Sequence, residues 1–139
     1  MPQIEFDNVG VTFDTSTGQR TVLRDINLSL NERRIGIIGA NGSGKSTLVR
    51  LINGLAEPTS GQVRVAGLNV AKRGREVRRK VGFVFSDADN QIIMPTVAED
   101  VAFSLRATTK SGREREERAT AMLRAMGLEH LADASPHFL

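Results

Sequence analysis

The chain has 139 residues, 40% of them hydrophobic and 25% charged, which fits one globular domain and argues against wholesale disorder. It has no cysteine, tryptophan or tyrosine and only two histidines, which excludes disulfides and thiolate or histidine-rich metal sites and argues against an aromatic base-stacking surface. With a net charge of only +3, no signal peptide and no apolar run of the roughly 18 residues that span a bilayer, we expect a cytoplasmic protein.

The first two thirds of the chain show alternating strand and helix patterns. Period-two alternation of apolar residues predicts strands over 3–13 and 21–30. Short continuous apolar runs at 34–38 and 81–85 predict strands that are buried on both faces. The other elements expected here are a helix over 46–53 ending at Gly54, a strand over 62–66 and a basic helix over 72–80.

The last third has only helical patterns. Thr96 with Glu99, and Ser111 with Glu114, have the spacing of capping boxes and predict two helix starts. Apolar residues at helical spacing predict one buried face, formed by Ala119, Met122, Leu123 and Met126. Gly127 followed by Leu128 predicts that the second helix ends in a Schellman motif.

One motif points to chemistry. The run Gly39-Ala40-Asn41-Gly42-Ser43-Gly44-Lys45-Ser46 fits the phosphate-binding pattern G-x-x-x-x-G-K-[ST], between a predicted strand and a predicted helix. The glycines let successive backbone amides point inward as an anion nest, and the helix start adds the positive end of its dipole. Lys45 supplies a cation for the β- and γ-phosphates, and Ser46 supplies a hydroxyl for Mg²⁺. The motif therefore predicts a nucleoside triphosphate site.

Beyond this loop, several segments resemble the nucleotide-binding subunit of ABC transporters. These are residues 22–30, the loop and helix start at 39–48, and the turns at 53–55 and 58–61. Residues 81–85, 89–91 and 95–103 are similar to the energy-coupling-factor importers of the cobalt, nickel and biotin type. Residues 32–38 with the following loop resemble the biotin branch.

The resemblance implies an α/β fold, that of the P-loop NTPases of ABC type. We expect an antiparallel β region over 1–33, a partial RecA-like core over 34–95 and the start of a helical subdomain over 96–139. ATP and Mg²⁺ would bind at residues 39–47, with Thr47 as a further phosphate contact, and Phe13 or Thr15 would contact adenine. The region implied to be the Q-loop consists of Ser86, Asp87, Asp89, Asn90 and Gln91, with Ser86 where the family has glutamine.

The resemblance also implies how the protein works. Two such subunits, identical or different, would close over ATP, and the helical subdomain would dock on a membrane-embedded partner at the inner face of the cell membrane. In the family, the signature sequence, the Walker B aspartate and the catalytic glutamate follow a leucine such as Leu139. We therefore expect that this chain holds no catalytic residue, that hydrolysis requires further C-terminal sequence, and that the chain alone is inactive.

Two alternatives stay open from the sequence. In a self-contained kinase-like enzyme, Asp87 would be the Walker B carboxylate after the apolar run at 81–85. The chain could instead be an ATP-binding regulatory module that never hydrolyses ATP. The basic segment 72–80 could form a nucleic-acid patch, but a solvated helix face explains it more simply, so we expect no nucleic-acid partner.

Overall fold

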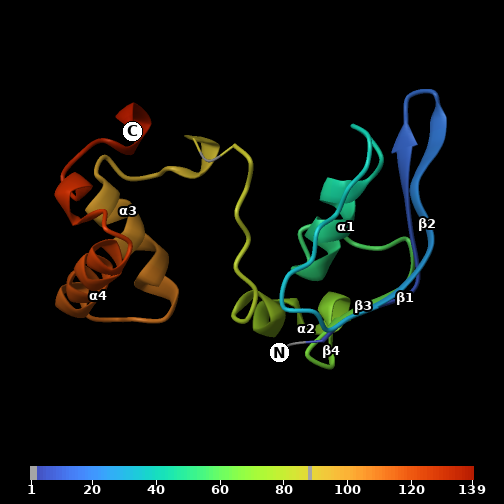
Figure 1. Ribbon diagram of the computed structural model, residues 1–139, viewed down its shortest axis with the longest axis horizontal. Coiled ribbons are helices and arrows are strands. Elements are labelled where there is room, and N and C mark those ends of the chain that lie inside the picture. Colours follow the sequence, from blue (N-terminus) through green and yellow to red (C-terminus); the bar gives the residue numbers. More distant parts are fainter. Residues whose placement is uncertain (1–2, 88) are drawn as a thin grey trace. The chain divides into compact units, whose positions relative to one another are not determined.

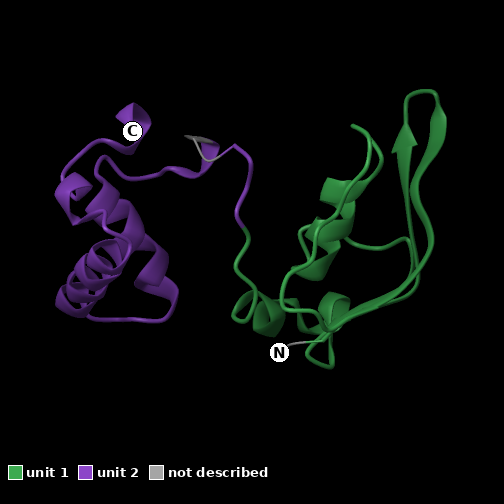
Figure 2. Cartoon of the chain, viewed as in Figure 1, with its two compact units in different colours: residues 1–83 green, residues 84–139 purple. Residues whose placement is uncertain are grey.

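The computed structural model describes residues 3–87 and 89–139. The chain divides into two compact units, residues 1–83 and 84–139, which are coloured separately in Figure 2. The sequence-based boundaries at 33/34 and 95/96 differ from this division and stay a prediction about subdomains. Among the described residues, no helix is long and apolar enough to cross a membrane.

The first unit contains a four-stranded antiparallel sheet with the order β2-β1-β3-β4. Its strands are β1 (Ile4–Thr15), β2 (Gly18–Leu30), β3 (Ser60–Val65) and β4 (Leu68–Asn69). Both long strands were predicted from their alternation, and they form the hairpin drawn in blue in Figure 1. Strand β1 lies between β2 and β3, so its apolar residues occupy the middle of the core.

Two helices complete this unit, α1 (Lys45–Ile52) and α2 (Val70–Arg78). Both were predicted from the sequence within two residues at each end. Leu51 of α1 and Val77 of α2 are fully buried and join the sheet residues Val9, Val11 and Val65 in one core. Burial of each such side chain contributes about 1.5–3 kcal/mol, so this core fixes the position of α1 and of the loop before it.

Two predicted strands are absent. Residues 34–38 and 81–85 are irregular, and Ile38 and Val84 are 99% and 95% exposed. Apolar composition suits a strand that is buried on both faces, but a strand also needs a neighbour to which its backbone can pair. Neither segment belongs to the sheet β2-β1-β3-β4, so the prediction of buried strands is wrong for both.

The second unit is built around two helices, α3 (Val97–Ser104) and α4 (Gly112–Ala125). Both begin at the predicted caps, because the Thr96 hydroxyl accepts a hydrogen bond from the Glu99 amide at 3.3 Å and Ser111 accepts one from the Glu114 amide, also at 3.3 Å. The remaining elements are short 3-10 turns: η1 (Asp89–Gln91), η2 (Leu105–Ala107), η3 (Glu129–Leu131) and η4 (Pro136–Phe138).

The end of α4 confirms the predicted Schellman motif. The Leu128 amide donates to the Leu123 carbonyl at 2.8 Å, and the amide of Gly127, whose φ is 72°, donates to the Arg124 carbonyl at 3.0 Å. In the last turn of α4, Arg124 donates two hydrogen bonds to the carboxylate of Glu129 in η3, and these bonds lower the pKa of Glu129. Both side chains are exposed, so this pair contributes little stability.

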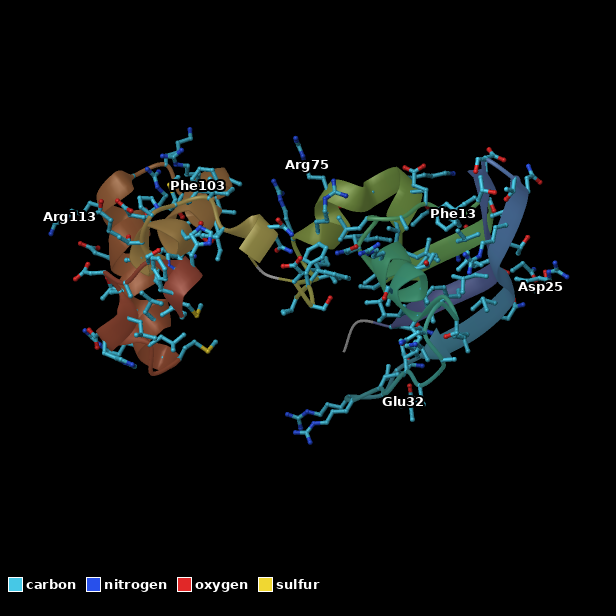
Figure 3. The ribbon with its side chains drawn as sticks, turned by 90° about the horizontal axis from the view of Figure 1, so that it is seen from above. Phe13, Asp25, Glu32, Arg75, Phe103 and Arg113 are labelled. Atoms are coloured by element: carbon cyan, nitrogen blue, oxygen red, sulfur yellow. The ribbon has the colours of Figure 1, made fainter. Side chains whose placement is uncertain are left out.

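The predicted buried face of α4 is only half right. Ala119 and Leu123 are buried, but Met122 and Met126 are mostly exposed. Helical spacing places all four on one stripe, but only Ala119 and Leu123 lie in its buried part. On another side of the helix, Arg113 projects outward, as Figure 3 shows, and pairs with Glu117 at 2.9 Å.

Candidate nucleotide-binding site

The glycine-rich loop leads into α1, beside the β1–β2 hairpin (Figure 1). Gly42 and Gly44 have φ values of 79° and 91°, a left-handed conformation that side chains disfavour. A Cβ atom on Gly44 would also lie 2.8 Å from the Leu23 side chain and 3.1 Å from the Val22 carbonyl oxygen of β2. Gly44 is therefore required both for its backbone angle and for the close approach of the loop to β2.

The ammonium of Lys45 lies inside this loop. Its Nζ donates hydrogen bonds to the carbonyl oxygens of Gly39 at 2.8 Å and Ala40 at 2.7 Å. An ammonium has three N–H donors, so at least one stays available to a ligand. The loop thus holds a positive charge among its own backbone carbonyls.

The start of α1 leaves polar groups available. Gly44 is the N-cap residue and provides no side-chain cap, so amides of the first turn have no intrahelical acceptor. In the part of the chain that the structure describes, no hydrogen bond engages the hydroxyl of Ser46 or of Thr47. A helix N-terminus, an ammonium and two hydroxyls without a protein partner fit the polyphosphate and Mg²⁺ that the motif predicts.

The two candidate adenine contacts differ in their surroundings. Phe13 is 47% exposed on β1, so its ring is accessible to a ligand. The hydroxyl of Thr15 donates to the Gly18 carbonyl at 2.6 Å and thereby holds the hairpin turn. Of the two, Phe13 is better suited to stack on a base, and its role as an adenine contact stays a prediction.

The hairpin also brings one residue to the loop that the sequence did not single out. Arg20 of β2 is paired directly with Phe13 of β1, and its Nη2 atom lies 4.0 Å from the position that a Cβ on Gly42 would take. Residues 20 and 42 are distant in sequence and share no motif, so no sequence signal indicates this proximity.

The predicted Q-loop residues lie in the second unit, within 84–139. The Asn90 side chain donates to the Asp87 carboxylate at 2.8 Å, while Ser86 is exposed and Gln91 ends η1. The side chain of Asp89 lies outside the described residues. Because each unit is described by itself, the role of these residues in the nucleotide site stays a prediction.

Comparison with known proteins identifies the family of most of the chain. The sequence model of the family described as "ABC transporter" matches residues 23–138, which includes the loop and nearly all of the second unit. The chain belongs to the ABC transporter family. The kinase-like alternative loses its support, since the segment around Asp87 lies inside this match.

Individual relatives of this ABC transporter chain support the same family assignment. It is 46% identical to a Bartonella quintana protein and 44% identical to the biotin transport ATP-binding protein BioM of Rhizobium etli, each over 136 residues. These alignments cover 98% of this chain and 58% of each relative, so the chain spans less than two thirds of their length.

Solved structures confirm the fold as that of an ABC ATPase domain. The ATP-binding cassette MJ0796, solved as a dimer with ADP and phosphate, has a TM-score of 0.79 and 29% identity. CbiO1 of Clostridium perfringens, part of the ABC transporter complex CbiONQ, has a TM-score of 0.77 and 30% identity. Both comparisons cover 98% of this chain, and they cover 62% and 55% of the two structures.

Proposed function

We propose that this chain binds ATP·Mg²⁺ as the energy-supplying part of a membrane importer. The observation that carries the proposal is the Lys45 ammonium, held by the carbonyls of Gly39 and Ala40 at the N-terminus of α1. Residues 39–47 surround the phosphates, Ser46 supplies a hydroxyl to Mg²⁺, and Phe13 stacks on adenine. Bound Mg²⁺ would neutralise phosphate charge during phosphoryl transfer.

The cargo is a vitamin or a metal ion, of the biotin or cobalt type. The similarity to BioM and to CbiO1 supports this proposal. Deletion of the gene should lower the uptake of labelled biotin or of Co²⁺ by the cell, and uptake should return with the wild-type gene but not with Lys45→Ala. Unchanged uptake of both cargoes in the deletion strain would contradict the importer proposal.

The partners are a second ATPase subunit, identical or different, and a membrane-embedded subunit. The dimeric form of MJ0796 and the membership of CbiO1 in CbiONQ support them. The chain contacts the membrane only through that subunit, at the inner face of the cell membrane, and binds no nucleic acid. Its second unit, with α3 and α4, is the part that docks.

Hydrolysis requires residues that lie beyond those of this chain. The alignments cover only 58% of each relative, and apolar side chains such as Ile38 and Val84 are exposed. We expect the 139-residue chain to show no ATP turnover and low soluble yield, and a C-terminally extended form to show both turnover and better yield. Turnover by the 139-residue chain, measured as phosphate release, would contradict this prediction.

A further inference from the structure

We propose that Arg20 contacts the phosphate groups of the bound nucleotide, as a second cation that the β1–β2 hairpin supplies. The proposal rests on the ATP site proposed above and assigns one more residue to it. The assignment follows from three observations: the position of Arg20 in the sheet, its distance from the loop, and the absence of a competing partner.

The sheet register places Arg20 beside the candidate adenine contact. Phe13 and Arg20 are directly paired across β1 and β2, and paired residues in an antiparallel sheet point to the same face. A base stacked on Phe13 therefore has the Arg20 side chain next to it, on the strand that lies closer to the phosphate loop.

The loop packs against this same stretch of β2. Gly44 comes so close to Val22 and Leu23 that a Cβ atom would not fit, which fixes the loop relative to the strand. Two residues earlier on β2, the Arg20 Nη2 atom lies 4.0 Å from the Cβ position of Gly42. The guanidinium thus lies at the edge of the loop, within reach of a phosphate bound there.

The charge of Arg20 is not neutralised by a carboxylate. In the regions 3–87 and 89–139, all ion pairs involve other arginines, namely Arg73, Arg113, Arg118 and Arg124. A guanidinium is weakly hydrated and its planar array of N–H donors matches phosphate oxygens. A guanidinium without a carboxylate partner at the edge of this loop has phosphate as its natural partner, whereas Lys45 provides a point charge at the carbonyls of Gly39 and Ala40.

The test is the affinity of the C-terminally extended protein for nucleotides, measured by calorimetry with ATP, ADP and adenosine. Arg20→Gln should weaken ATP and ADP binding about tenfold, the effect of one charge-assisted hydrogen bond, and leave adenosine binding unchanged. Arg20→Lys keeps the charge and should retain part of the lost affinity. Arg24→Gln removes an equal charge four residues along the same strand and should bind all three ligands as the wild type does.

Each outcome separates this inference from the function on which it rests. Wild-type ATP affinity in Arg20→Gln would overturn the role of Arg20 and leave the ATP site intact. A loss of adenosine binding equal to the loss of ATP binding would also overturn it, because the effect would then be on the base or the fold. A wild-type protein that binds no ATP would overturn the proposed function and this inference together.

Discussion

Replacement of Lys45 by alanine is expected to weaken ATP binding by roughly 10- to 100-fold. Hydrogen bonds to charged groups contribute about 1.5–3 kcal/mol, and each 1.4 kcal/mol corresponds to about a factor of ten in affinity. The Lys45 Nζ atom already lies between the carbonyl oxygens of Gly39 and Ala40, at 2.8 and 2.7 Å. The wild type therefore holds its ammonium close to the phosphate position before ATP arrives, and the variant loses this charge.

Two further variants show whether the effect belongs to this position. Lys72→Ala removes the same charge from the exposed side of α2, so its ATP affinity should equal that of the wild type. Lys45→Arg keeps the charge but replaces a compact ammonium with a wider planar group, and it should not restore wild-type affinity. Equal affinity of Lys45→Ala and Lys72→Ala, measured by calorimetry with ATP and Mg²⁺, would refute the assignment of residues 39–47 as the phosphate site.

The conformation of the glycine-rich loop could be predicted from the sequence because its determinants are local. Glycines at fixed positions, a lysine and a hydroxyl are all contained in eight consecutive residues, and the structure places Gly42 and Gly44 at positive φ as that pattern requires. The helix caps at Thr96 and Ser111 were predictable for the same reason, since a cap involves residues only three apart.

Features that depend on distant segments were not predictable from the sequence. The approach of Arg20 to Gly42 depends on how the hairpin packs against the loop, and no spacing within the chain encodes it. The runs at 34–38 and 81–85 have the composition of buried strands, but pairing is a property of two segments, and neither belongs to the described sheet. Composition thus predicts which face a segment prefers, whereas the presence of neighbours decides whether it forms a strand.

Gly61→Ala is expected to destabilise the protein by about 2–5 kcal/mol, a large share of the 5–15 kcal/mol by which a domain is usually stable. Gly61 of β3 has a φ of 72°, which costs a residue with a side chain about 1–2 kcal/mol. A Cβ there would also overlap the backbone carbonyl oxygens of Asp7 and Asn8 in β1. Backbone atoms of a paired strand cannot rotate away, so the strands must separate locally, and such overpacking costs about 1–3 kcal/mol more.

Gly67 provides a matched control, because it lies just after the other end of β3 with a φ of 75° but has no atom within 4 Å of its Cβ position. Gly67→Ala should therefore cost only the backbone term, about 1–2 kcal/mol. Both substitutions restrict the unfolded chain equally, so this contribution cancels in the comparison. Urea unfolding of the C-terminally extended protein, followed by circular dichroism, measures both variants. Equal midpoints would show that the close approach of Gly61 to Asp7 and Asn8 of β1 adds nothing to the cost of the substitution.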